Sequence, residues 1–245
     1  MISGADIHTH TQTHTGLGRR AFLKSVVASG VALAAGPAAS SLPESKARPL
    51  KPPETGLIQV ACAISQGTTE IDWIGPQAVF ETWHRDAAGK PAPKFRIFTV
   101  SETRDAVDGR IADYTFETAP RAHVVVVPAQ RGSDALLAWL KRVVGSCDVL
   151  MSVCVGARHL AKAGLLDGQT ATTHHGAVDQ LTKEFPAVKW VRGVRFVEGD
   201  RISTGGGLTA GIDLALRVAE RYLGRDAAKM VAEHLEYEGR GWLIG

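Results

Sequence analysis

The chain has 245 residues, of which 44% are hydrophobic and 22% are charged, as in an ordinary globular protein with one large or two small domains. The net charge of +3 is too small to indicate a nucleic-acid partner, and three cysteines are too few for a disulfide framework. Because that count is odd, at least one thiol is unpaired within the chain.

Two arginines, Arg19 and Arg20, precede a moderately apolar run of small residues that extends to Ala35. A charged pair, an apolar run and a small-residue segment form the layout of a signal peptide, and the paired arginines resemble a twin-arginine export signal. The run is too short and too weakly hydrophobic for a stable membrane anchor. The alternative is a chance basic amphipathic helix. We predict a signal peptide over residues 1–41, the twin-arginine translocation machinery as a transient partner, and a periplasmic or otherwise exported protein.

Two further stretches have the composition of unstructured chain. Residues 8–14 alternate histidine with threonine or glutamine, a pattern that fits either a metal-binding tract or an unstructured leader that would be removed with the signal. Residues 42–55 are rich in proline and charge and predict a disordered linker. The folded domain is therefore expected over residues 56–245.

Within that domain, segments with strand character alternate with segments of helical spacing. Strands are expected over residues 57–64, 95–100, 123–127, 148–153, 170–173 and 188–191, with a hairpin over 195–204 and a connection or short strand over 114–119. Helices are expected over residues 77–85, 134–144, 159–166, 178–185, 209–223 and 226–237. The alternation predicts one α/β domain with a doubly wound, mainly parallel sheet.

Cys154 lies where a strand meets a helix, with Gly156 two residues later. Glycine lets the backbone bend sharply after a strand, as in turns that expose a nucleophile. The N-terminus of the next helix would favour the thiolate over the thiol. The alternative is a buried structural cysteine, which is the expectation for Cys62 inside the first strand.

Asp72 and His174 also follow predicted strands, so they are expected at the same edge of the sheet as Cys154. Asp72 fits either a carboxyl partner of the thiol or a simple helix N-terminal cap. His174 fits either a site residue or a strand-end histidine held by backbone groups. Residues 205–207 are three glycines before a helix, but no lysine follows at P-loop spacing, so we interpret them as close packing rather than a phosphate site.

Motifs in a fixed order, at residues 152–157, 163–168, 171–174 and 204–213, resemble the ThiJ/PfpI family of the class I glutamine amidotransferase-like superfamily. The Asp-Trp-Ile-Gly-Pro segment that begins at Asp72 is most similar to the isonitrile hydratase branch. The resemblance covers residues 56–242. It implies a flavodoxin-like three-layer sandwich with a nucleophile elbow, often dimeric, so we expect a homodimer and neither a cofactor nor a metal.

Carried over by position, the resemblance implies that Cys154 is the nucleophile, that Asp72 is its carboxyl partner and that His174 lies near both. The residues expected to contact substrate are Gly75, Arg131, Val155, Gly156 and His175.

Several positions depart from the family pattern. Val155 stands where hydratase relatives commonly carry threonine and protease-like members carry histidine, so a hydroxyl is missing and protease activity is not expected. His175 replaces a tryptophan that is more frequent in the hydratase branch. Residues 128–132 replace a Pro-Gly-Gly loop and bring Arg131 instead. These departures weaken the transfer of the hydratase substrate and leave the thiol site in place.

The sequence therefore predicts an exported cysteine-dependent hydratase or lyase that acts on a small electrophile, an isonitrile or a reactive aldehyde. The alternative is a ligand-binding or thiol-based redox-sensing module with a stress-protective role. Sensor domains of this fold occur fused to AraC-type DNA-binding regions. The chain ends at Gly245 and carries an export-like leader, so no nucleic-acid partner is expected.

Overall fold

The computed structural model describes residues 47–82, 90, 95–105 and 107–243, so the predicted signal peptide lies outside the described residues. A seven-stranded sheet is formed within these ranges, in the order β3-β2-β1-β4-β5-β9-β8. Its strands are β1 (Ile58–Ala63), β2 (Phe95–Ser101), β3 (Tyr114–Thr115), β4 (Val124–Val127), β5 (Val149–Ser152), β8 (Phe196–Val197) and β9 (Ile202–Gly205). Neighbours pair in parallel, except that β8 and β9 form the predicted antiparallel hairpin.

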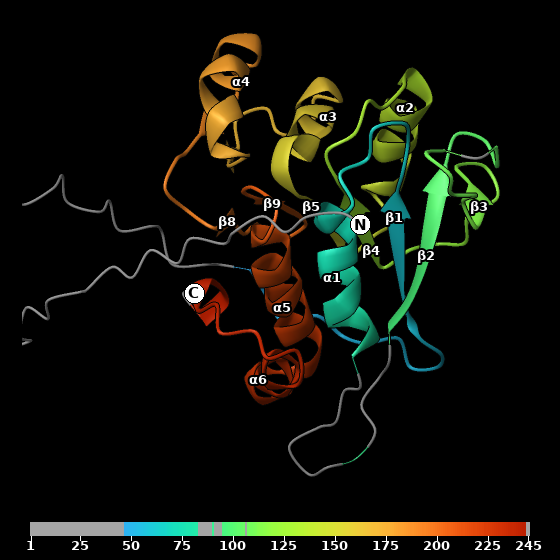
Figure 1. Cartoon of the computed structure of the whole chain (residues 1–245), viewed down its shortest axis with the longest axis vertical. Coiled ribbons are helices and arrows are strands. Elements are labelled where there is room, and N and C mark those ends of the chain that lie inside the picture. Colours follow the sequence, from blue (N-terminus) through green and yellow to red (C-terminus); the bar gives the residue numbers. More distant parts are fainter. Residues whose placement is uncertain (1–46, 83–89, 91–94, 106, 244–245) are drawn as a thin grey trace, which may run out of the picture. The chain divides into compact units, whose positions relative to one another are not determined.

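Helices cover both faces of the sheet (Figure 1). They are α1 (Ile71–Glu81), α2 (Asp134–Val143), α3 (Ala157–Lys162), α4 (Val178–Glu184), α5 (Ala210–Leu223) and α6 (Arg225–His234). Two short strands, β6 (Thr170–Ala171) and β7 (Lys189–Trp190), pair separately from the large sheet. The predicted α/β architecture with a mainly parallel, doubly wound sheet is confirmed. None of the helices in the described ranges is long and apolar enough to cross a lipid bilayer.

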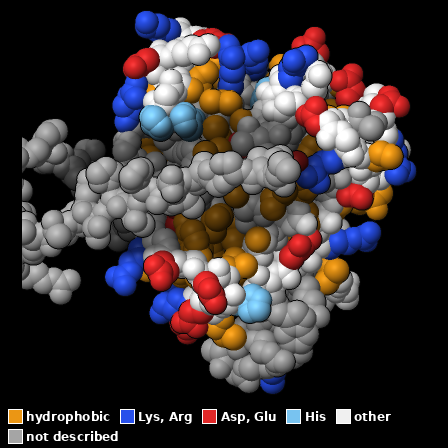
Figure 2. All heavy atoms as spheres, viewed as in Figure 1, with side chains coloured by type: hydrophobic (Ala, Val, Ile, Leu, Met, Phe, Trp, Pro, Cys, Tyr) orange, Lys and Arg blue, Asp and Glu red, His pale blue; other side chains and the backbone are white. Residues whose placement is uncertain are grey.

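The central strands carry a hydrophobic core on each face. In β4, Val124 and Val126 pack into the cluster that contains residues of α1, α5 and α6, and Val125 and Val127 pack into the cluster of α2 and α3. All four valines are fully buried. Successive side chains of a strand point to opposite faces, so a continuous valine run is the pattern of a strand covered on both sides. Charged side chains surround much of one face of the molecule, with hydrophobic side chains in its middle (Figure 2).

α1 begins earlier than the sequence predicted, at Ile71 instead of Gln77. A Gly-Pro pair usually marks a break, but here Gly75 and Pro76 lie inside the helix. As a result, Asp72 lies in the first helical turn and not in a loop.

The small residues of α1 and α5 explain the exception, because they let the two helices pack closely. A Cβ atom on Gly75 would lie 3.1 Å from Cγ1 of Ile212. A Cβ atom on Gly211 would lie 3.1 Å from both methyl groups of Val153 and 3.3 Å from Cγ of Pro76. Through Gly211, α5 thus lies against both Pro76 of α1 and Val153, the residue that follows β5.

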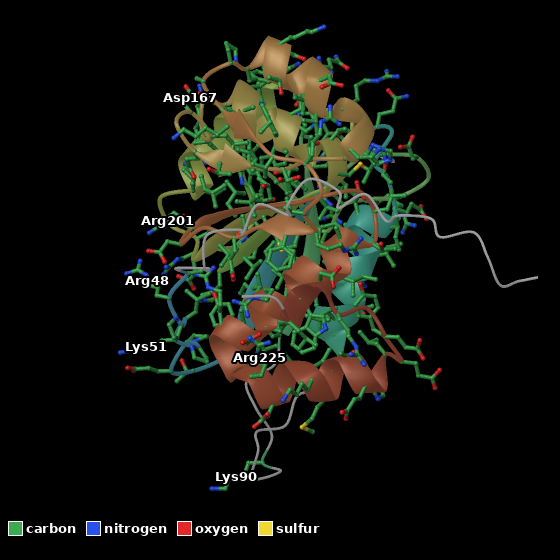
Figure 3. All side chains as sticks on the ribbon, turned by 90° about the vertical axis from the view of Figure 1, so that its left-hand side faces the viewer. Arg48, Lys51, Lys90, Asp167, Arg201 and Arg225 are labelled. Carbon is green, nitrogen blue, oxygen red and sulfur yellow. The ribbon has the colours of Figure 1, made fainter. Side chains whose placement is uncertain are left out.

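The N-terminal boundary of the domain also differs from the prediction. The Leu50 N–H donates to the Arg221 carbonyl oxygen at 2.7 Å, and the Arg221 Nε donates to the Arg48 carbonyl oxygen at 3.0 Å. The Arg48 N–H also donates to Asp200, next to Arg201 on the same side of the molecule (Figure 3). The domain therefore reaches back to Arg48, ahead of the predicted start at Gly56, and this part of the predicted linker is held against α5.

We expect Gly211→Val to lower the free energy of unfolding by about 2 kcal/mol, because the added methyl groups collide with Val153 and Pro76. Gly145→Val is the control, since a Cβ atom there meets nothing within 4 Å, and its effect should stay within about 0.5 kcal/mol. Urea unfolding of both variants gives the comparison, and equal losses of stability would contradict the proposed helix contact.

Candidate active site

Cys154 sits on a sharp turn between β5 and α3. Its φ of +58° is left-handed, a conformation that a non-glycine residue adopts only under constraint. The 3-10 turn Cys154–Gly156 leads directly into α3. A Cβ atom on Gly156 would lie 2.1 Å from the Val127 carbonyl oxygen, so only glycine fits beneath the turn. The predicted nucleophile elbow is present, and Gly156 serves it as a close-packing residue.

The glycine-rich segment before α5 closes over this turn. The Cys154 N–H donates to the Gly206 carbonyl oxygen at 2.7 Å, and the Thr173 hydroxyl donates to the Cys154 carbonyl oxygen at 2.9 Å. Leu208, which follows the three glycines, has a φ of +51°. Its N–H acts on the Cys154 thiol to lower the pKa of that group. The structure thus gives residues 205–207 the predicted packing role.

Asp72 is completely buried beside the thiol. Its Oδ2 accepts a hydrogen bond from the Ala129 N–H at 3.0 Å, and among the described residues its Oδ1 has no hydrogen-bond partner. Burial raises the Asp72 pKa to about 6, although the Ala129 N–H acts in the opposite direction. The N-cap position of α1 is Glu70, so the interpretation of Asp72 as a simple cap is wrong.

Cys154 is buried, with only 7% of the residue exposed. Its pKa is raised, first by burial and then by the charge of Asp72, while the N–H groups of Val155 and Leu208 act to lower it. The expectation of a thiol with a low pKa at a helix N-terminus is therefore wrong for the resting site. Burial outweighs the donors, and the resting group is a thiol next to a carboxyl group.

His174 lies in the wall of the site, half-buried and next to the glycine-rich segment. Its Nδ1 accepts a hydrogen bond from the Gly176 N–H at 3.2 Å, so the neutral ring carries its proton on Nε2. A Cβ atom on Gly207 would lie 2.5 Å from Cδ2 of this ring. Within the described part of the chain, His174 is not hydrogen-bonded to Cys154. His174 thus offers an N–H donor to the site instead of a base.

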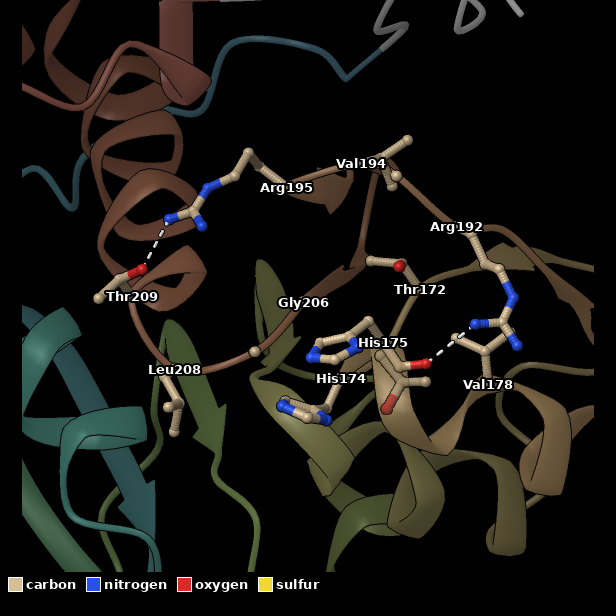
Figure 4. A pocket seen from close by; sticks show the side chains of 13 residues that line it. Thr172, His174, His175, Val178, Arg192, Val194, Arg195, Gly206, Leu208 and Thr209 are labelled. Carbon is tan, nitrogen blue, oxygen red and sulfur yellow. Dashed lines mark hydrogen bonds between the residues drawn. The ribbon is translucent and has the colours of Figure 1, made fainter. Parts of the chain in front are cut away.

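His174 and its neighbours enclose a cavity of about 330 Å³ (Figure 4). Its lining comprises Thr172, Thr173, His174, His175, Val178, Arg192, Gly193, Val194, Arg195, Gly206, Gly207, Leu208 and Thr209. Because Thr173 and Leu208 also contact Cys154, the cavity borders the elbow. A cavity of this size accommodates a small molecule.

Of the other predicted residues, Gly75 and Arg131 lie away from the cavity, whereas Val155 and His175 lie at the site. Gly75 is buried at the contact of α1 with α5, and this packing accounts for it without a substrate. Arg131 is exposed and donates from Nη1 to the Gln66 side chain at 2.7 Å, away from the cavity lining. The Val155 N–H reaches the thiol, and its side chain packs against the hydrophobic core. His175 lines the cavity, with its ring 4.4 Å from that of His174.

Sequence reasoning missed three contributors. The N–H groups of Leu208 and Ala129 serve the thiol and Asp72, and a backbone donor leaves no residue-type signal. His159 is buried, and its Nε2 hydrogen-bonds the Gln130 carbonyl oxygen at 3.0 Å. It fixes the loop that carries Ala129. Its position five residues after Cys154 on a helix was the available signal.

The part of the chain that the structure describes contains no group of three or more His, Cys, Asp or Glu side chains placed to hold a metal ion. Cys62 and Cys147 are buried free thiols on strand β1 and before β5, and burial raises the pKa of both. Within the described residues, Cys154 is thus distinguished from the other thiols by its turn and its carboxyl neighbour.

Comparison with known proteins places this geometry in a family. The DJ-1/PfpI family profile matches residues 59–221. The isonitrile hydratase of Pseudomonas putida is 38% identical over 130 residues, which cover 50% of this chain and 55% of that protein. The HTH-type transcriptional regulator CdhR of Pseudomonas aeruginosa is 34% identical over 106 residues, 43% of this chain and 31% of the regulator. The chain thus matches about half or less of the length of these relatives.

Superposition on solved structures leads to the same family. A ThiJ/PfpI family protein from Pseudomonas syringae superposes with a TM-score of 0.64 at 27% identity, covering 75% of this chain and 76% of that one. DJ-1beta of Drosophila melanogaster superposes with a TM-score of 0.62 over 75% of this chain and 100% of its own, and at 18% identity it shows the shared fold alone. The chain belongs to the DJ-1/PfpI family.

Proposed function

We propose that this protein is a cysteine-dependent hydratase or lyase that acts on a small electrophile, an isonitrile or a reactive aldehyde. The observation that carries the proposal is the buried pair of Asp72 and Cys154, in which an unpartnered carboxylate oxygen and a protonated thiol lie beside a small cavity. The similarity to isonitrile hydratase supports the same assignment.

With an isonitrile, the pair carries out proton transfer and nucleophilic attack together. The Asp72 carboxylate takes the thiol proton, and the sulfur of Cys154 forms a bond to the terminal carbon of the isonitrile. That carbon takes the proton from Asp72, which leaves a thioimidate. Water then adds to the carbon and its proton passes to nitrogen. The carbon–sulfur bond breaks as the carbonyl forms, the hydroxyl proton returns to sulfur, and an N-substituted formamide leaves.

The backbone supports the charged stages of this sequence. The N–H groups of Val155 and Leu208 face the sulfur, so they stabilise the thiolate both when it forms and when it departs. The Nε2–H of His174 is one donor available to a polar group in the cavity. With an aldehyde, the same thiol adds to the carbonyl carbon and the oxygen takes the proton, giving a hemithioacetal.

A thiol-based sensing or ligand-binding role is the second candidate. The comparisons favour it, because the relatives include transcriptional regulators such as CdhR. In that role the cavity would bind a ligand without turnover, and oxidation of Cys154 would be the signal.

We also propose that the protein is exported by the twin-arginine route. The support is the sequence around Arg19 and Arg20, followed by an apolar run and small residues. This route accepts folded proteins, so a catalytic site would be complete before it leaves the cytoplasm.

Turnover separates the two candidate functions. Cys154→Ser is expected to lower kcat for an isonitrile at least about 1000-fold, and Asp72→Asn about 100-fold or more, because nucleophile and proton carrier are lost. Cys147→Ser is the matched control, since that buried thiol lies outside the cavity lining, and it should keep near wild-type activity. Absence of turnover of both isonitriles and aldehydes, with stoichiometric modification of Cys154 by a thiol reagent, would favour the sensor.

The pH dependence tests the proton carrier. Asp72 accepts the thiol proton only when ionised, and its pKa is raised to about 6, so kcat/KM is expected to fall as the pH drops through about 6. Asp72→Asn should lose this limb of the profile, whereas His174→Gln should keep it. A limb that survives in Asp72→Asn would assign the titration to another group.

Export has its own test. Replacing Arg19 and Arg20 together with lysine is expected to leave uncleaved precursor in the cytoplasm, measured by cell fractionation and immunoblotting. Arg104→Lys, on the surface of the folded domain, is the control and should leave export unchanged. Normal export of the double variant would contradict the proposed route.

A further inference from the structure

His159 is a buried histidine that the proposed mechanism does not use. It lies on α3, the helix that begins directly after the Cys154 turn, and only 6% of the residue is exposed. Its Nε2 lies 3.0 Å from the Gln130 carbonyl oxygen. A carbonyl oxygen can only accept a hydrogen bond, so the ring carries its proton on Nε2 and donates it to Gln130. The side chain is therefore a fixed donor toward the loop of residues 128–132.

The ring is neutral at physiological pH. Burial lowers the pKa of His159, the Gln130 carbonyl oxygen opposes this effect, and the positive charges of Lys162 and Arg158 on the same helix support it. A neutral imidazole has a single N–H group, and the bond to Gln130 uses it. His159 thus has no proton to supply to the reaction, and its contribution is to hold the loop in place.

The loop is fitted around this ring. The backbone at Gly132 has a φ of +70°, and a Cβ atom there would lie 2.5 Å from Cε1 and 2.9 Å from Nδ1 of His159. The ring therefore lies directly against the Gly132 backbone while it bonds the Gln130 carbonyl oxygen. Contact at two points two residues apart fixes the position of the loop relative to α3.

The same loop holds Asp72 on its other side. The Ala129 N–H donates to Oδ2 of Asp72 at 3.0 Å, and the Ala129 carbonyl oxygen accepts from the Thr69 N–H at 2.8 Å. α1 and α3 cover opposite faces of the sheet, since Phe80 of α1 and Leu160 of α3 belong to different core clusters. The loop after β4 thus connects the helix that carries Asp72 with the helix that follows Cys154.

We propose that His159 is a positioning residue: through the loop of residues 128–132, it holds the Asp72 carboxyl group in place beside the Cys154 thiol. The part of this inference that concerns turnover rests on the proposed function, because that function makes Asp72 the proton carrier. The anchoring of Asp72 is a property of the folded chain and can be measured without a substrate.

The ionisation of Asp72 reports directly on the anchor. The Ala129 N–H favours the ionised carboxyl group, whereas burial disfavours it. His159→Leu removes the donor to Gln130, so the loop and its Ala129 N–H should move away from Asp72. The pKa of Asp72 is then expected to rise by about one pH unit, since a hydrogen bond to an ionised group is worth this much or more. NMR titration of the full chain labelled with carboxyl-13C aspartate measures it, and the Asp72 signal is the one missing from Asp72→Asn.

Three further variants separate positioning from general destabilisation. His159→Phe keeps a ring against Gly132 without a donor, so it should act like His159→Leu and provides a second variant if the first does not fold. His159→Gln keeps an N–H donor at a similar reach and should restore the wild-type pKa of Asp72. Leu160→Val is the matched control, because it alters the neighbouring buried residue of α3, and it should lower the free energy of unfolding without moving this pKa.

Activity gives the second readout. His159 lies outside the cavity lining, so His159→Leu is expected to lower kcat for an isonitrile about tenfold with little change in KM. The acid limb of the kcat/KM profile should move to higher pH together with the pKa of Asp72. His159→Gln should recover most of the lost kcat.

The outcomes are distinct. A higher Asp72 pKa in the variants without a donor, a normal one in His159→Gln and an unchanged one in Leu160→Val support the positioning role. An Asp72 pKa that stays the same in His159→Leu and His159→Phe, or that rises equally in His159→Gln or Leu160→Val, overturns it. If the pKa responds as expected but wild-type protein turns over neither isonitriles nor aldehydes, the positioning role stands and the hydratase function fails. If wild-type protein is active and His159→Leu keeps both its kcat and its Asp72 pKa, the function stands and the positioning role fails.

Discussion

The site depends on how closely the chain crowds the end of β4. The Val127 carbonyl oxygen accepts a hydrogen bond from the Val153 N–H at 3.0 Å and leaves no room for a side chain at Gly156. Two residues later, the Ala129 N–H binds Asp72. One strand end thus forces the turn that presents Cys154 and anchors the carboxyl group beside it. Because all of these contacts are to the backbone, the arrangement is insensitive to side-chain choice in the loop and highly sensitive to volume at Gly156.

Burial decides how the thiol and the carboxyl group behave. Water would favour both charged forms, but the enclosed site disfavours two neighbouring negative charges, so the pair retains one proton near neutrality. The Val155 and Leu208 N–H groups do not offset burial in the resting state. Their effect is largest when negative charge develops on the sulfur, which is the stage at which preorganised donors contribute most to catalysis. The reactivity of Cys154 is therefore conditional on a bound electrophile.

Sequence reasoning predicted the sheet, the elbow and the residues around it where residue type carries the signal. The valine run 124–127 marked a strand buried on both faces, and Gly156 marked the turn. Sequence reasoning failed where the conformation of one segment depends on its packing against a distant segment. Gly75 and Pro76 have the local character of a break, but they lie inside α1, where they pack against Ile212 and Gly211 of α5. It also could not find the Leu208 N–H, since any residue provides one, or foresee that Arg131 bonds Gln66 and stays out of the cavity.

The backbone and the side chain of Leu208 have separate roles in the site. Its backbone N–H acts to lower the pKa of the Cys154 thiol, while the residue is 42% exposed and lines the cavity. The side chain can therefore change without removing the donor, provided that the new residue tolerates a positive φ. Replacement of this side chain can then change which molecules the cavity binds, while the backbone donor and the chemical step stay the same. Asparagine, aspartate and glycine adopt this backbone conformation most readily, so they are the replacements through which new specificities would arise at the lowest cost in folding.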